Sequence, residues 1–136
     1  MAISVLSGGL LSSKPAVAQL LPPAEKAARV RITQGPEIES ASSYLTIVRW
    51  TTNNPGGSDE HFGVVHYGTD LKNLSETAKS HIRLNRGHPD TVFRVRLDAL
   101  KPKTTYHYKV TSIESNGKSD GEESAINRFT VPGPAR

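Results

Sequence analysis

The stretch Leu100 to Tyr108 reads LKPKTTYHY and is the part of the sequence that decides the fold. It sets a leucine, a proline and a tyrosine at fixed offsets, just before a run in which Tyr106, Tyr108 and Val110 alternate with polar residues. Apolar residues at every second position indicate a β-strand with one buried face. The stretch therefore predicts a strand over Thr105 to Ile113 that is entered through a tight turn.

Runs with the same period of two lie on both sides of this strand. Gly35 and Pro36 are expected to end the first run, and Asn116 to Gly121 to form a polar hairpin loop. No segment has a convincing helical period, so the sequence predicts an all-β, seven-stranded antiparallel sandwich of two sheets with Greek-key connections. The other expected strands are Arg29 to Gln34, Tyr44 to Thr52, Phe62 to Tyr67, a weaker Glu76 to Leu84, Thr91 to Leu97, and Ala125 to Val131. The expected core comprises Trp50, Tyr67, Phe93, Leu97, Leu100, Tyr106, Tyr108 and Phe129.

The L-x-P-x-T-x-Y pattern formed by Leu100, Pro102 and Tyr106, together with Trp50 on the second strand, resembles fibronectin type III domains, a family of immunoglobulin-like sandwiches. In that family the tyrosine that matches Tyr106 forms a tyrosine corner, in which its hydroxyl binds the backbone and its ring joins the core. The resemblance implies a structural role for Leu100, Pro102 and Tyr106.

A closer resemblance is to the fibronectin-like N-terminal domain of purple acid phosphatases. It rests on the motifs VRWTT at Val48 to Thr52, VHYGT at Val65 to Thr69 and FTVP at Phe129 to Pro132. It implies that the two-metal site of such phosphatases would lie in a following α/β domain, whose G-D-x-G and G-N-H-E motifs this sequence lacks. We therefore expect no enzyme activity and no cofactor in this chain.

A length of 136 residues suits one folded domain. We expect a signal peptide over residues 1–18, a linker over 19–28, the sandwich over 29–132 and a tail over 133–136. The signal peptide is inferred from a short apolar stretch followed by the cleavage-type sequence Ala16-Val17-Ala18. That stretch is too short to span a bilayer, so the expected location is secreted, periplasmic or at the cell surface.

Catalytic and metal-binding patterns are missing from the sequence. Cysteine is absent, and the five histidines have no paired ligand spacing, since His61 and His66 are expected on opposite faces of a strand and His107 points outward. The glycine-rich segment Pro55 to Ser58 lacks the lysine and helix of a phosphate-binding loop. Residues Ser115 to Gly121 lack the Arg-Gly-Asp integrin motif. No serine lies in a nucleophile elbow.

The outward positions of three predicted strands carry an unusual number of arginines. We call this set the arginine face, and it comprises Arg29, Arg31, Ile47, Arg49, Arg94 and Arg96. Guanidinium groups pair in two-pronged fashion with carboxylates and phosphates, so the face is a candidate binding surface for an acidic protein or an anionic envelope polymer. The alternative is a solvated face that keeps a small domain soluble and protects its edge strands.

Three functions stay open at this stage. The first is a noncatalytic extracytoplasmic interaction module, expected to be a monomer. The second is the accessory domain of a purple-acid-phosphatase-like metallohydrolase, and the third is a structural spacer or assembly subunit. Nucleic acid is not an expected partner, because no aromatic residues alternate with the basic ones to stack on bases.

Overall fold

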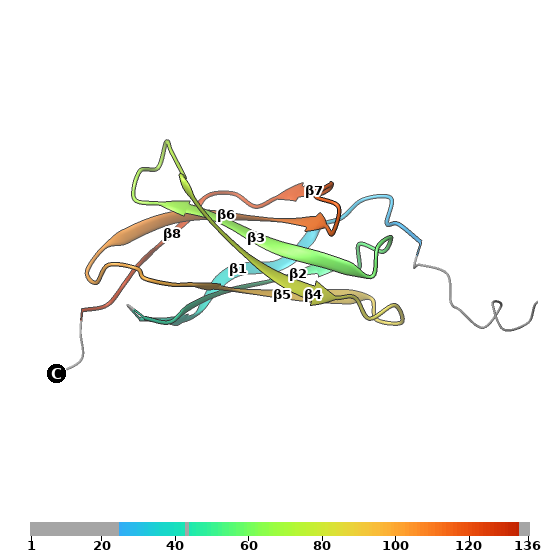
Figure 1. The fold of residues 1–136 in the computed structure, drawn as a ribbon, viewed down its shortest axis with the longest axis horizontal. Helices are drawn as coiled ribbons and strands as arrows, with labels where there is room; N and C mark the ends of the chain where they lie inside the picture. The colour runs from blue at the N-terminus through green and yellow to red at the C-terminus, as the bar shows by residue number, and fades with distance from the viewer. Residues whose placement is uncertain (1–24, 43, 134–136) are drawn as a thin grey trace, which may run out of the picture.

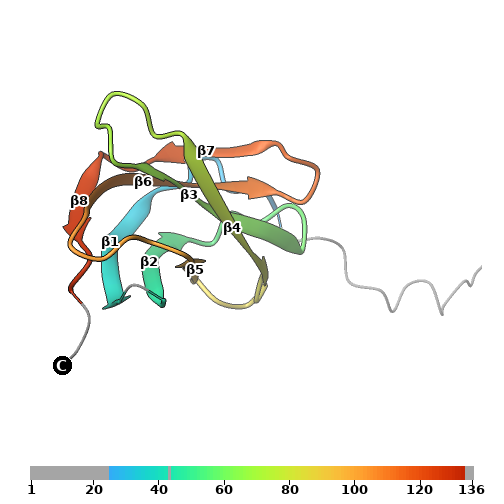
Figure 2. The same cartoon turned by 60° about the vertical axis from the view of Figure 1, so that its left-hand side comes forward.

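The computed structural model describes residues 25–42 and 44–133, so the predicted signal peptide lies outside the described part. Figure 1 and Figure 2 show a sandwich of two strand layers, with the first described residues (blue) at one end and the last (red) at the other. The strands are β1 (Ile32–Ala41), β2 (Thr46–Asn53), β3 (Glu60–Gly68), β4 (Glu76–Arg83), β5 (Asp90–Leu97), β6 (Thr105–Glu114), β7 (Ser119–Glu123) and β8 (Asn127–Thr130).

All strand pairs are antiparallel, and they form two sheets. One sheet has the order β1-β2-β5, and the other has the order β4-β3-β6-β7, with β8 also paired to β6. The chain changes sheet after β2, after β4 and again after β5, which gives the crossed connections of a Greek-key sandwich. The predicted all-β sandwich is therefore confirmed. No described helix is long and apolar enough to cross a membrane.

Eight strands replace the predicted seven because an additional strand, β7, lies before the predicted last strand, which corresponds to β8. Strands β7 and β8 pair with successive halves of β6, and Ser124 lies between them with its hydroxyl accepting a hydrogen bond from the amide of Val110 at 2.9 Å. The predicted hairpin loop is too long, since Ser119 to Gly121 belong to β7. The hydrophobic pattern does not reveal this strand, because its buried position is occupied by Asp120 and not by an apolar side chain.

The first strand also differs from its prediction. We expected Gly35 and Pro36 to end it, but β1 continues to Ala41 and shifts its register against β2 around these two residues. Strand β1 lies at the edge of its sheet, where a missing backbone donor at proline is tolerated. The extension matters for the surface, because it carries Glu37 and Glu39.

Trp50 and Phe93 form the centre of the core. Their rings stack with centroids 5.2 Å apart and an interplanar angle of 16°. Gly63 on β3 leaves the room for this pair, since a Cβ atom there would lie 2.9 Å from the Phe93 ring. Of the predicted core residues, Tyr67 and Phe129 are partly buried and the rest are buried.

Candidate functional site

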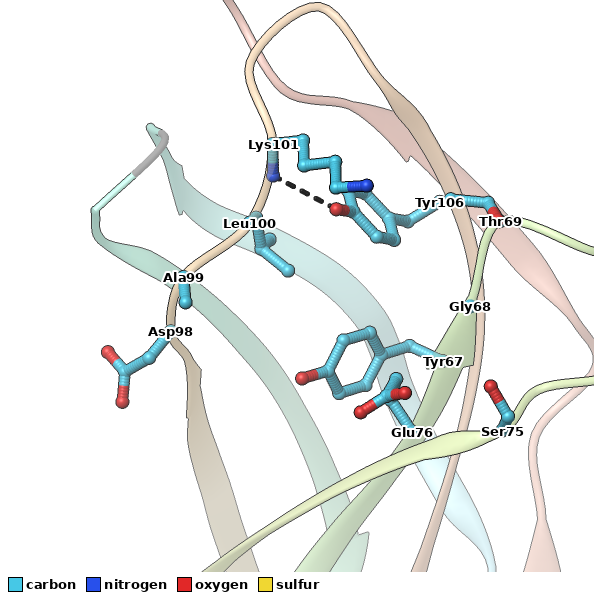
Figure 3. A pocket seen from close by; sticks show the side chains of 10 residues that line it. All are labelled: Tyr67, Gly68, Thr69, Ser75, Glu76, Asp98, Ala99, Leu100, Lys101 and Tyr106. Atoms are coloured by element: carbon cyan, nitrogen blue, oxygen red, sulfur yellow. Dashed lines mark hydrogen bonds between the residues drawn. The ribbon is translucent and has the colours of Figure 1, made fainter.

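The tyrosine corner has the geometry that the sequence motif predicts. The Lys101 amide donates a hydrogen bond of 3.0 Å to the Tyr106 hydroxyl, drawn in Figure 3. The turn before β6 places Ala99 and Lys103 in the left-handed region, at φ 58° and φ 56°. Leu100 lies between them and is buried in the core. The corner bond therefore holds a turn whose backbone is strained at two residues.

An open hollow of 330 Å³ lies beside this corner, and its lining is drawn in Figure 3. Two carboxylates line it, Glu76 and Asp98, but Asp98 is paired with Arg96 at 2.6 Å. Burial, and then the charge of Glu76, raise the pKa of the Tyr67 phenol, which therefore stays protonated at neutral pH. These groups form the outer wall of the corner.

Four members of the arginine face lie together on the outer side of the three-stranded sheet. Arg49 on β2 lies directly opposite Arg94 on β5, and Ile47 lies directly opposite Arg96. Arg31 precedes β1, and its amide donates to the Asn53 side chain at 2.6 Å. The Asn53 amide group in turn donates to the backbone oxygen of Arg29 at 2.8 Å. Arg29 and Arg31 are therefore near the last residue of β2, whereas Ile47 is near its first.

Carboxylates offset the charge of this face. Arg94 makes a two-pronged ion pair with Glu39, and this hydrogen bond lowers the pKa of the Glu39 carboxyl. Glu37 lies opposite Arg49 in the β1–β2 register. With Asp98 on Arg96, three carboxylates accompany the three central guanidinium groups. Glu37 and Glu39 come from the part of β1 that we did not expect to be a strand.

The opposite end of the sandwich contains a buried charged network that the sequence motifs did not predict. His61 on β3 and Asp120 on β7 have fully buried side chains, and the His61 Nδ1 lies 2.8 Å from the Asp120 Oδ2. The Ser112 hydroxyl donates to the same oxygen at 2.7 Å. Lys26 donates to the other Asp120 oxygen at 2.9 Å and to Glu114 at 2.8 Å. We call these five residues the His61 network.

The network extends the folded unit into the predicted linker. Besides the contacts of Lys26, the Ala27 amide donates to the Pro55 carbonyl at 2.8 Å. A Cβ atom at Gly56 would collide with the backbone oxygen of Glu25, so glycine is required for this close approach. The segment before β1 is therefore packed against the loop between β2 and β3.

The hydrogen-bond partners fix the charge state of His61. Its Nε2 faces the carbonyl oxygens of Gly56 and Ser58 at 3.1 and 3.0 Å, so Nε2 must carry a proton. Desolvation by burial lowers the pKa of His61, but the hydrogen bond to Asp120 and its negative charge outweigh it, and the pKa is raised. Burial in turn raises the pKa of Asp120, but the bonds from His61, Lys26 and Ser112 outweigh it, and this pKa is lowered. Below pH 6.5 the two groups therefore form an imidazolium–carboxylate pair.

Ser112, Asp120 and His61 are the residue types of a catalytic triad, but the hydrogen bonds between them run in the wrong order for catalysis. A nucleophilic serine must donate its proton to the histidine, whereas Ser112 donates to Asp120. The Nε2 of His61 is already bonded to Gly56 and Ser58, and the ring is inaccessible to solvent. We therefore assign the network a structural role.

One signal in the sequence could have revealed part of this network. His61, Gly63 and Val65 occupy every second position of a strand and therefore share one face. Because Val65 is a natural core residue, the alternation predicts that His61 also faces the core. Its partner Asp120 is 59 residues away within a polar segment, and no spacing rule connects the two. The described residues contain no group of three or more residues able to hold a metal ion.

Comparisons with known proteins agree with this architecture. A family model described as the purple acid phosphatase N-terminal domain matches residues 37–131. No curated protein matches the chain.

Solved structures provide more distant matches. A longer form of the sensor domain of the anti-sigma factor RsgI4 in Pseudobacteroides cellulosolvens aligns with a TM-score of 0.54 at 18% identity, covering 79% of this chain and 93% of that one. A shorter form of the same sensor domain gives a TM-score of 0.51 at 21% identity, covering 80% and 100%. The third fibronectin III domain of human KIAA0343 protein aligns with a TM-score of 0.39 at 16% identity, covering 84% and 86%.

At these identities the sensor-domain structures support the shared sandwich fold alone. The family match spans most of the described sandwich, including Trp50, the VHYGT motif and the tyrosine corner. The chain therefore belongs to the family of purple acid phosphatase N-terminal domains.

Proposed function

We propose that this chain is a noncatalytic interaction module that acts outside the cytoplasm and binds an acidic or anionic partner through an outer sheet face. The observation that carries the proposal is how the charged groups are divided between the interior and the surface of the domain. In the interior, His61 and Asp120 pair with each other, while Arg49, Arg94 and Arg96 lie together on the outer side of the three-stranded sheet. The family match supports the proposal, because it is to an N-terminal domain of the phosphatases.

The arginine face is one candidate surface. Its test is binding of the full chain to polygalacturonate and to polyglutamate at low and raised salt, compared with the variant R31Q/R94Q/R96Q. Glutamine removes the charges without setting new carboxylates beside Glu39 and Asp98. Salt-sensitive binding that the variant loses, with an unchanged melting curve, would support this face. No binding of either polymer by either protein would contradict an anionic partner.

The extracytoplasmic location has a separate test. Cleavage after Ala18 would leave Gln19 as the first residue of the exported protein, and mass spectrometry of secreted or periplasmic material would detect that end. Intact Met1 in the cytoplasmic fraction alone would contradict the location.

A second function is favoured by the family match, namely an accessory domain of a purple-acid-phosphatase-like metallohydrolase. In that case the coding sequence would continue past Arg136 into a domain with metal-ligand motifs. Sequencing the complete transcript tests this, since a stop codon directly after Arg136 would contradict it.

A further inference from the structure

The outer side of the five-stranded sheet contains an unpartnered surface that differs from the arginine face. Two hollows of 300 and 450 Å³ adjoin there, and Leu71 and Ile126 line both. Leu71 is 52% exposed and Ile126 is 45% exposed, which is high for aliphatic side chains. We call this surface the Leu71–Ile126 patch, and it comprises His66, Leu71, Lys72, Lys109, Ile126 and Arg128.

The backbone holds both aliphatic residues in place. Leu71 lies in the turn between β3 and β4, where the Asn73 amide donates to the Asp70 carbonyl and the Lys72 amide to the Asp70 carboxylate, each at 2.9 Å. Ile126 lies in the break between β7 and β8, beside the Ser124 hydroxyl that bonds Val110. Because hydrogen bonds hold the backbone next to both residues, the two segments would lose little backbone entropy on binding.

Cations surround the two aliphatic residues. Lys109 on β6 lies opposite His66 on β3, and Arg128 on β8 lies opposite His107. Among the described residues that line the two hollows, the single carboxylate is Glu123, 3.4 Å from Lys109. Burial, and then the nearby Lys109 charge, lower the pKa of His66, as expected in a positive environment. In contrast to the arginine face, this surface keeps most of its positive charge.

We propose that the Leu71–Ile126 patch docks an acidic protein segment, which places an apolar side chain between Leu71 and Ile126 and its carboxylates on Lys72, Lys109 and Arg128. The inference rests on the proposed function and assigns it to one surface and one class of partner. Charge complementarity calls for carboxylates, and the aliphatic centre favours a protein over a polysaccharide, which has no aliphatic side chain to bury.

The test is a ¹H–¹⁵N NMR titration of the full chain with three probes at millimolar concentration. The first is the peptide Glu-Glu-Phe-Glu-Glu, the second has serine in place of its phenylalanine, and the third is polygalacturonate. The patch predicts salt-sensitive shifts around His66, Leu71 and Ile126 that are strongest with the first peptide. The variant L71S/I126S should weaken its binding about tenfold. The control variant R94Q/R96Q should bind as the wild type does.

The other outcomes separate this inference from the proposed function. Shifts confined to Arg49, Arg94 and Arg96 would overturn the patch while leaving an anionic partner in place. Polygalacturonate binding as tightly as the first peptide, or equal binding of the two peptides, would overturn the acidic protein segment. Absence of shifts with all three probes would contradict both the patch and the proposed function.

Discussion

The two ends of the sandwich are closed by different chemistry. At the end where β5 leads into β6, a neutral hydrogen bond from the Lys101 amide to Tyr106 holds a strained turn. At the other end, the charged pair of His61 and Asp120 joins β3 to β7 and holds Lys26. This difference shows that buried ionisable residues in this domain can hold the strands together at one end of the sandwich. It also shows that His, Asp and Ser side chains in contact are not by themselves a catalytic site.

The largest expected effect is at the charged end. Replacing Asp120 by alanine leaves the buried imidazolium of His61 without its counter-charge, and should lower the free energy of unfolding by about 3 kcal/mol or more. Urea denaturation at pH 6 measures it. Asp98→Ala is the matched control, because that carboxylate is exposed on the surface. A loss no larger than that of the control would remove the claimed difference between the two ends.

An intermediate effect is expected at the centre of the core, between the two ends. Gly63→Ala adds a methyl group 2.9 Å from the Phe93 ring and 3.0 Å from the Trp50 ring, so it should destabilise the fold by about 1–3 kcal/mol. Gly87→Ala is the control, since a Cβ there meets only the Asn85 side chain at 3.9 Å. Equal unfolding midpoints for the two variants in urea would mean that the Trp50–Phe93 stack can shift freely.

A smaller effect is expected at the neutral end. Tyr106→Phe removes the hydroxyl that accepts from the Lys101 amide, and should cost about 1 kcal/mol in thermal or urea denaturation. Tyr67→Phe is the control, because the Tyr67 hydroxyl makes no hydrogen bond to any residue that the structure describes. If the control loses as much stability as Tyr106→Phe, the corner bond is not the cause.

The two ends should also differ in their response to pH. The folded-state pKa of His61 is raised above 6.5, so its contribution to stability is complete below pH 6.5 and is lost as the pH rises through the raised pKa. The pKa of Asp120 is lowered below 3.8, so its contribution is complete above pH 3.8 and is lost as the pH falls through the lowered pKa.

Denaturation between pH 5 and pH 9 measures this difference. The destabilisation by Asp120→Ala should shrink above pH 6.5, whereas that by Tyr106→Phe should stay constant. Equal pH dependence of the two differences would contradict the charge state assigned to His61.

The sequence could predict the tyrosine-corner end of the sandwich but not the His61 end. The corner is encoded within seven residues, Leu100 to Tyr106, so its bond could be expected from a local pattern. The alternation of Phe93, Val95 and Leu97 with polar residues is also a local pattern, so it correctly predicted that these side chains lie in the core. The His61–Asp120 pair could not be expected, because two residues 59 apart meet only after β3, β6 and β7 have assembled.

The charge of the outer faces shows the same limit. Alternation along β2 and β5 placed Arg49, Arg94 and Arg96 on one surface, as observed. The partner of Arg94, Glu39, lies beyond Gly35 and Pro36, where an edge strand tolerates a proline that a central strand would exclude. The ion pair between β5 and β1 could therefore not be predicted, because the sequence rules end the first strand at Gly35 and Pro36, before Glu39.

The claim that the interior ionisable groups are structural can be tested most directly on the two histidines of β3. Long-range ¹H–¹⁵N spectra recorded as a function of pH report the protonation of both ring nitrogens of each. The account predicts that His61 keeps both protons to a midpoint above 6.5, while His66 on the outer face titrates below 6.5. A His61 midpoint at or below that of His66 would leave a neutral ring with a free lone pair, and would contradict the structural imidazolium.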